Sequence, residues 1–155
     1  MTKQITIKSG EFVKVINVVV QEAWYSIEQC KANPRSIYVF GDNLLRVGEA
    51  GQASIRSCNN AIGIATKKKP SMLKSSFFSD NEYDKLEPFL KKEMDKIVSI
   101  IFSDNVDTLV FPIDGLGTGL SKLPQMAPKV FLALSALLYK TFGIVTDQKT
   151  YKLSI

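Results

Sequence analysis

Short apolar runs alternate along the chain with loops rich in glycine and charged residues. Residues 2–8 alternate polar and apolar side chains, and residues 12–20 form a β-branched run, so both segments predict strands. The runs 37–40 and 108–113 are almost wholly apolar, which is typical of strands buried on both faces of a sheet. A mixed run at 60–66 predicts another short strand.

Helical periodicity is clearest between residues 83 and 102. Seven apolar side chains share one face there, at Leu86, Phe89, Leu90, Met94, Ile97, Val98 and Ile101. Pro88 within this segment predicts that the regular helix begins near Glu87. Further helices are predicted at residues 21–32, 52–58 and 126–142. Residues 67–81 are expected to form a long loop, and residues 144–155 a weak strand or a tail.

The order of these segments predicts an α/β fold. Strands that alternate with helices imply parallel crossovers and a sheet covered on both faces. No linker, repeat or low-complexity segment divides the chain, so residues 1–155 are expected to form a single domain. Ligands of such sheets bind beyond the carboxyl ends of the strands. Two glycine-rich loops stand at that position and become the candidate site.

Composition narrows the chemistry that this site can carry. The chain has no histidine and two cysteines, so a zinc site is not expected and an acid–base reaction would need Asp, Glu, Lys or Tyr. The net charge of +5 suits solubility and also attraction to anions. No basic stripe with interleaved aromatics is present, so nucleic acid is not an expected partner. Without an apolar span or a signal sequence, a cytoplasmic protein is predicted.

The first loop, residues 41–53, directly follows the apolar run 37–40. Its glycines allow close approach of the backbone to a ligand, and amides at a helix start favour phosphate. Asp42 and Asn43 can reach a ribose hydroxyl or the edge of a base. The alternative interpretation is a turn and helix cap in which Gly48 and Gly51 serve only loop geometry.

The second loop, residues 114–119, reads Asp-Gly-Leu-Gly-Thr-Gly and follows the run 108–113. Three glycines at alternate positions can wrap a diphosphate, with Thr118 as an additional donor. The loop lacks the Gly-Lys-Ser/Thr ending of a Walker A motif and the third glycine of the dinucleotide-binding pattern. Together, the two loops predict a site for a phosphate-bearing nucleotide.

The residues of both loops carry a resemblance to macrodomains. Residues 110–119, followed by Leu123-Pro124 and a helix, resemble the phosphate-binding loop late in macrodomains, and residues 39–53 are similar to their strand–Asn–glycine-rich loop segment. More closely, scattered motifs over residues 33–140 resemble an uncharacterised macrodomain-like family of phages and bacteria. These motifs are Gly41-Asp42-Asn43, Gly51-Gln52-Ala53, Asn60-Ala61-Ile62-Gly63-Ile64, Thr66-Lys67 and Gly117-Thr118-Gly119.

This resemblance implies a three-layer α/β/α fold with a mixed, mostly parallel central sheet. It also implies recognition of ADP-ribose or a related NAD-derived nucleotide, free, cyclic or protein-linked. A binder of this kind can sequester a signal in phage–host conflict. Macrodomains include both binders and ADP-ribosyl hydrolases, so both functions stay open, and no cofactor is expected.

The predicted ligand-binding residues come from both loops and from the end of the strand at 60–66. They are Phe40, Gly41, Asn43, Arg46, Gly48, Gly51, Gln52, Ala53, Thr66, Lys67, Ser71, Asp114, Gly115, Leu116, Gly117, Thr118 and Gly119. For hydrolysis, Asp42, Asn43 or Asp114 would position a water while loop amides stabilise the charge of the diphosphate. Trp24 and Tyr25 are predicted to belong to the hydrophobic core.

Overall fold

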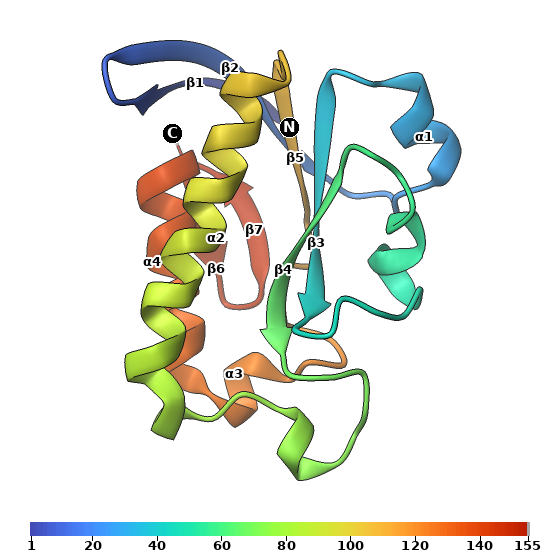
Figure 1. The fold of residues 1–155 in the computed structure, drawn as a ribbon, viewed down its shortest axis with the longest axis vertical. Coiled ribbons are helices and arrows are strands. Elements are labelled where there is room, and N and C mark those ends of the chain that lie inside the picture. Colours follow the sequence, from blue (N-terminus) through green and yellow to red (C-terminus); the bar gives the residue numbers. More distant parts are fainter. Residues whose placement is uncertain (155) are drawn as a thin grey trace.

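The computed structural model describes residues 1–154, and Ile155, the last residue of the predicted domain, lies outside the described residues. Its central sheet has five strands in the order β1–β2–β5–β3–β4, and only β1 runs antiparallel to its neighbour. Figure 1 shows the sheet between two groups of helices. The strands are β1 (Thr2–Ser9), β2 (Phe12–Gln21), β3 (Ser36–Asn43), β4 (Ala61–Lys67) and β5 (Thr108–Pro112).

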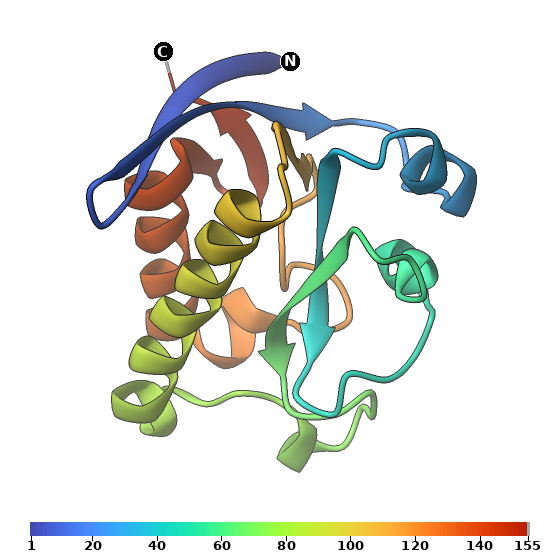
Figure 2. The same cartoon turned by 45° about the horizontal axis from the view of Figure 1, so that its top comes forward.

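Helices cover both faces of this sheet. On one face α2 (Tyr83–Ser103) packs beside α4 (Pro128–Phe142), with α3 (Leu123–Met126) leading into α4 (Figures 1 and 2). On the other face lie α1 (Ile27–Ala32) and the 3₁₀ helix η1 (Gly51–Ile55). Two short 3₁₀ turns, η2 (Lys74–Ser76) and η3 (Asp80–Glu82), precede α2, and a hairpin of β6 (Ile144–Asp147) and β7 (Thr150–Leu153) follows α4. The predicted three-layer α/β/α fold with a mostly parallel sheet is confirmed.

Strand β3 shows why an apolar run without alternation predicts an interior strand. Ile37 and Val39 belong to the large core between the sheet, α2 and α4, while Tyr38 and Phe40 belong to the smaller core beneath α1 and η1. Successive side chains of a strand point to opposite faces, so both faces of β3 require apolar residues. The strand continues past Gly41 to Asn43, which carries the polar residues of the first loop into the sheet edge.

The predicted helix at residues 21–32 is shorter in the structure. It begins only at Ile27, because the hydroxyl of Ser26 accepts a hydrogen bond from the N–H of Gln29 (3.1 Å) and caps the helix. The prediction that Trp24 belongs to the core is wrong, since this side chain is 66% exposed. Tyr25 is buried as predicted, and its hydroxyl donates to the carbonyl of Val39 (2.9 Å).

Other element boundaries also differ from the prediction. Helix α2 begins at Tyr83 and not near Glu87; Pro88 removes one backbone hydrogen bond, while buried Leu86 and Leu90 hold the helix on the core. The predicted helix at 126–142 is interrupted at Ala127, since a residue before proline leaves the α region. The predicted helix at 52–58 is the 3₁₀ helix η1. Of the two alternatives for the C-terminal segment, a weak strand or a tail, the structure has strand, in the form of the β6–β7 hairpin.

Candidate functional site

A cavity of about 770 Å³ opens at the carboxyl ends of the four parallel strands. Its volume lies within the range typical of small-molecule sites. Thirteen of the predicted site residues line it: Gly41, Asp42, Asn43, Gly48, Gly51, Gln52, Ala53, Lys67, Asp114, Gly115, Gly117, Thr118 and Gly119. The structure therefore brings both glycine-rich loops and the end of β4 to one cavity.

Glycine lets the two loops approach each other. A Cβ atom on Gly41 would lie 3.3 Å from the backbone nitrogen of Gly117. A Cβ atom on Gly117, where φ is +76°, would lie 3.0 Å from side-chain carbons of Thr66 and Leu123. The ends of β3 and β4 and the second loop thus meet at a point where no side chain fits.

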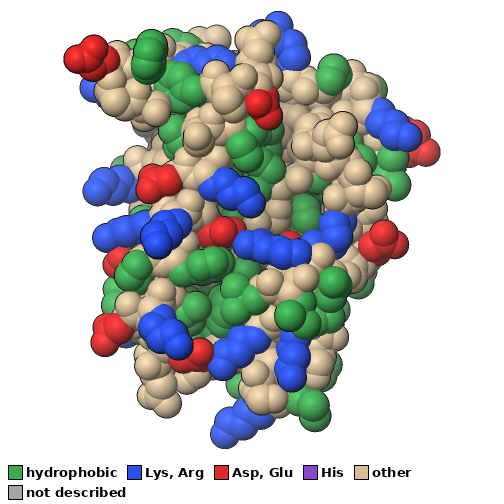
Figure 3. All heavy atoms as spheres, viewed as in Figure 1, with side chains coloured by type: hydrophobic (Ala, Val, Ile, Leu, Met, Phe, Trp, Pro, Cys, Tyr) green, Lys and Arg blue, Asp and Glu red, His purple; other side chains and the backbone are tan. Residues whose placement is uncertain are grey.

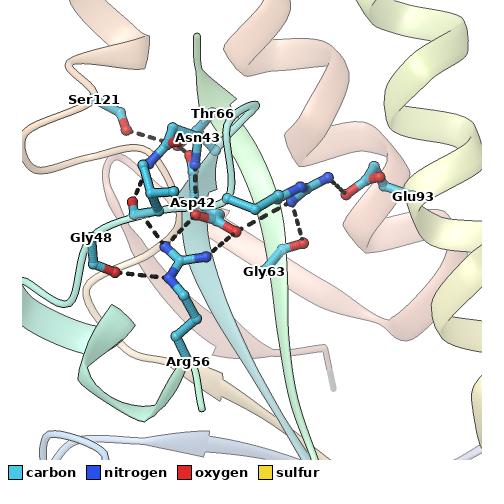
Figure 4. A network of polar contacts seen from close by, with 10 residues as sticks. Asp42, Asn43, Gly48, Arg56, Gly63, Thr66, Glu93 and Ser121 are labelled. Atoms are coloured by element: carbon cyan, nitrogen blue, oxygen red, sulfur yellow. Dashed lines mark hydrogen bonds and ion pairs between the residues drawn. The ribbon is translucent and has the colours of Figure 1, made fainter. Parts of the chain in front are cut away.

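The carboxylate of Asp42 lies at the centre of a buried ion-pair network (Figure 4). Both of its oxygens accept from the guanidinium of Arg56, at 2.6 and 2.9 Å, and Arg46 lies 3.4 Å away. Arg46 also donates to the carbonyl of Gly63 (2.8 Å) and pairs with Glu93 of α2 (3.0 Å). The network joins β3, β4, the first loop and α2. Arg46, which was predicted to bind the ligand, takes part in this network and does not line the cavity.

Arg56 also fixes the shape of the first loop. Arg56 donates to the backbone carbonyls of Gly48 (2.8 Å) and Val47 (3.2 Å), while the amide of Asn43 donates to the carbonyl of Val47 (2.8 Å). The side-chain oxygen of Asn43 is buried and has no hydrogen-bond partner within residues 1–154. A bound donor such as a hydroxyl group can satisfy this acceptor, because a buried unpaired oxygen is costly.

The second loop keeps several backbone donors free. The N–H of Gly115 donates to the carbonyl of Pro112 (3.1 Å), and the N–H of Leu116 donates to the hydroxyl of Tyr151 (3.0 Å). The N–H groups of residues 117–119 have no protein acceptor within the described chain. The hydroxyl of Thr118 donates to the carbonyl of Asp114. Its single donor is therefore used within the loop and is not available to a ligand as predicted. Consecutive free amides are typical of anion-binding loops.

Lys67 is a buried cation in the wall of this cavity. The residue is only 5% exposed, and its ammonium group lies 3.4 Å from the carbonyl oxygen of Leu120 and 4.5 Å from the ring centre of Phe77. No carboxylate of residues 1–154 lies within ion-pair distance of it, whereas the neighbouring Lys68 pairs with Glu82 at 2.9 Å. Burial, and secondarily the charge of Lys122, lowers the pKa of Lys67.

The C-terminal hairpin completes the cavity, although none of its residues was predicted to belong to the site. Lys149 and Thr150 at its turn line the cavity, and a Cβ atom on Gly115 would lie 2.6 Å from the carbonyl oxygen of Lys149. Tyr151 is buried, which raises the pKa of its hydroxyl, and its backbone N–H donates to the carbonyl of Ile113 (2.8 Å). The polar turn between two short apolar runs is the signal that could have revealed this hairpin.

Five predicted ligand-binding residues are not part of the lining. These are Phe40, Arg46, Thr66, Ser71 and Leu116. Two of them contact lining residues: Phe40 packs beneath the guanidinium of Arg56, and the hydroxyl of Thr66 donates to that of Ser121 (2.8 Å). The lining also contains ten residues that the prediction omitted: Trp24, Val47, Ala50, Arg56, Pro70, Met72, Leu120, Ser121, Lys149 and Thr150.

Charge is mixed over the face of the molecule that Figure 3 shows. Figure 3 shows Lys and Arg side chains interspersed with acidic and hydrophobic ones over one face. No helix within residues 1–154 combines the length and the apolar composition that crossing a bilayer requires.

One family model matches the chain. It describes a family of unknown function (DUF7831) and covers residues 20–137, which include both glycine-rich loops and exclude the C-terminal hairpin. No curated protein and no solved structure matches the chain.

Proposed function

The chain belongs to the DUF7831 family, and from its site we propose that it binds a phosphate-bearing nucleotide, ADP-ribose or a related NAD-derived nucleotide. The observation that carries the proposal is Lys67, a residue only 5% exposed, whose part-buried ammonium group lines the cavity without a carboxylate partner in residues 1–154. Buried charges in folded proteins are paired, so an anionic ligand is the expected counter-charge.

The second loop supports a phosphate group as that anion. The N–H groups of residues 117–119 have no protein acceptor in the described chain, and these residues share the cavity with Lys67. Phosphate oxygens accept several hydrogen bonds at once, and those made with a charged partner are the stronger ones. A diphosphate thus matches both the free amides and the lysine.

The remaining polar groups favour a sugar beside the phosphates. The buried side-chain oxygen of Asn43 needs a donor, and a ribose hydroxyl supplies one. The resemblance of both loops to those of macrodomains supports ADP-ribose over other nucleotides. In this proposal the protein acts in the cytoplasm, where it sequesters or recognises the nucleotide, free, cyclic or attached to a protein.

Hydrolysis of ADP-ribosyl groups is the second candidate, and the observation that favours it is Asp114. Its side chain is exposed, lines the cavity and forms no ion pair within residues 1–154. The carboxylate of Asp42, in contrast, is occupied by Arg56. Prolonged incubation of ADP-ribosylated protein with wild type and with Asp114→Asn tests this candidate; unchanged substrate with the wild type removes it.

Calorimetric titration with ADP-ribose tests the binding proposal. We expect heat of binding with the wild type and a loss of affinity in Lys67→Met. The matched control is Lys69→Met, which removes the same charge from an exposed neighbour and should leave affinity within about twofold. Absence of binding by ADP-ribose, NAD and their cyclic derivatives would overturn the proposal.

A further inference from the structure

We propose that Trp24 is the base-binding surface of the cavity, so that a bound nucleotide stacks its base on the indole ring. This inference rests on the proposed nucleotide function and adds a requirement to it: the ligand must carry a planar aromatic group. The residue lies outside both glycine-rich loops and is 66% exposed at the cavity wall.

The backbone around Trp24 is fixed although its side chain is exposed. The N–H of Tyr25 donates to the side-chain oxygen of Gln52 (2.9 Å), and the side-chain amide of Gln21 donates to the carbonyl of Ala23 (2.9 Å). The neighbouring Tyr25 is 4% exposed. The indole is therefore presented by a held segment, which reduces the ordering cost of binding.

Gly51 of the first loop lies beside the ring. A Cβ atom on this glycine would lie 3.7 and 3.8 Å from Cζ3 and Cη2 of the indole, and the φ angle of +60° there favours glycine. The six-membered ring of Trp24 thus lies beside the first loop, and the loop and the ring belong to one cavity. A ligand that follows the glycines of the first loop meets the indole.

Apolar side chains complete the environment that a base requires. Val47, Pro70, Met72 and Leu120 also line the cavity, and Val47, Met72 and Leu120 are each about half or more exposed. Large apolar side chains left open within a small-molecule cavity gain contact area when a flat ligand covers them. Stacking of a base on an aromatic side chain contributes about 1–3 kcal/mol and tolerates different bases.

An exposed tryptophan is also typical of protein–protein contacts. The place of Trp24 distinguishes the two roles, since its ring shares a concave cavity with the free amides of the second loop and with buried Lys67. A surface for a protein partner would not need the ring to lie beside an anion-binding loop.

The chain offers a direct test, because Trp24 is its single tryptophan, and fluorescence excited selectively over that of the five tyrosines reports on this side chain. The probes are ADP-ribose, which carries a base, and pyrophosphate, which does not. We expect ADP-ribose to quench the emission and pyrophosphate to leave it nearly unchanged. Trp24→Ala should weaken ADP-ribose roughly 5- to 150-fold, Trp24→Phe should restore most of the loss, and both variants should bind pyrophosphate within about twofold of wild type.

Phe12→Ala is the matched control, because Phe12 is a 74% exposed aromatic residue outside the cavity lining. Circular dichroism and the midpoint of thermal unfolding verify that each variant is folded. If Trp24→Ala binds ADP-ribose as tightly as wild type does, the base-binding role is overturned while the nucleotide proposal stands. If ADP-ribose, NAD and their cyclic derivatives all fail to bind the wild type, both proposals fail.

Discussion

Replacing Lys67 by methionine should affect the free energy of unfolding and the affinity for ADP-ribose differently. The substitution keeps a long unbranched side chain and removes the charge. In the structure the Lys67 side chain is largely buried, and its part-buried ammonium group has no carboxylate partner within residues 1–154. Its polar contacts there are the carbonyl of Leu120 at 3.4 Å and the sulfur of Met72 at 3.9 Å, and it lies over the ring of Phe77 at 4.5 Å.

The expected changes follow from these contacts. Loss of the cation–π contact with Phe77 removes about 0.5–2 kcal/mol, while relief of the buried charge acts in the opposite direction. The free energy of unfolding of Lys67→Met should therefore stay within about 1 kcal/mol of wild type or rise, which corresponds to roughly 2–4 °C in Tm. A charge-assisted hydrogen bond to phosphate contributes about 1.5–3 kcal/mol, so affinity for ADP-ribose should fall roughly 10- to 150-fold.

The pH dependence has a defined sign. Because burial lowers the pKa of Lys67 from 10.5, the unfolded chain binds more protons than the folded one between the lowered pKa and 10.5. Wild-type stability therefore gains a contribution as pH rises through this window, and the penalty is fully present below it. Lys67→Met lacks this contribution, so its stability relative to wild type should be greatest near neutral pH and decline toward pH 10.5.

Urea unfolding at pH 7 and at stepwise higher pH measures the first effect, and calorimetric titration with ADP-ribose measures the second. Lys69→Met serves as the control for both. A ligand-binding role of Lys67 is refuted if Lys67→Met loses more than about 2 kcal/mol of stability while it binds ADP-ribose like the wild type. That result would make Lys67 a structural residue.

Three substitutions and one control test the contacts that support the cavity. Arg56→Met should lower the free energy of unfolding by about 3 kcal/mol in urea, because it leaves the buried carboxylate of Asp42 without its bidentate partner; a loss below 1 kcal/mol would contradict this. Gly63→Ala should lower Tm, since its Cβ atom would meet the Asp42 carboxylate, while Gly119→Ala, which meets nothing within 4 Å, should not. Tyr151→Phe should cost about 1–3 kcal/mol and speed hydrogen exchange of the loop amide that bonds to its hydroxyl; unchanged exchange would argue against the contact.

The local sequence pattern was sufficient to predict those elements whose structure does not depend on which distant residues pack against them. The run 37–40 needs only to be apolar on both sides to predict an interior strand. Because the carboxyl ends of parallel strands share one edge, the order of segments also predicted that residues 41–53 and 114–119 would line one site.

Residues whose role depends on distant partners could not be assigned this way. Asp42 was expected to face a ligand, and the structure pairs its carboxylate with Arg56, fourteen positions along the chain. Arg46 reaches Glu93 on α2 in the same network. An exposed arginine and one that neutralises a buried carboxylate look alike in sequence, since side-chain pairing is decided by packing between elements.

The cavity itself shows the same division. The sequence determined the chemistry available to it, two glycine-rich loops and no histidine, from which an anionic ligand is predicted. Tertiary structure alone decided that Lys67 is buried without a carboxylate, that Trp24 faces the cavity, and that the hairpin carrying Lys149 completes the wall. Burial is a property of what packs around a side chain, and contacts between residues far apart in the chain leave no local pattern from which it can be read.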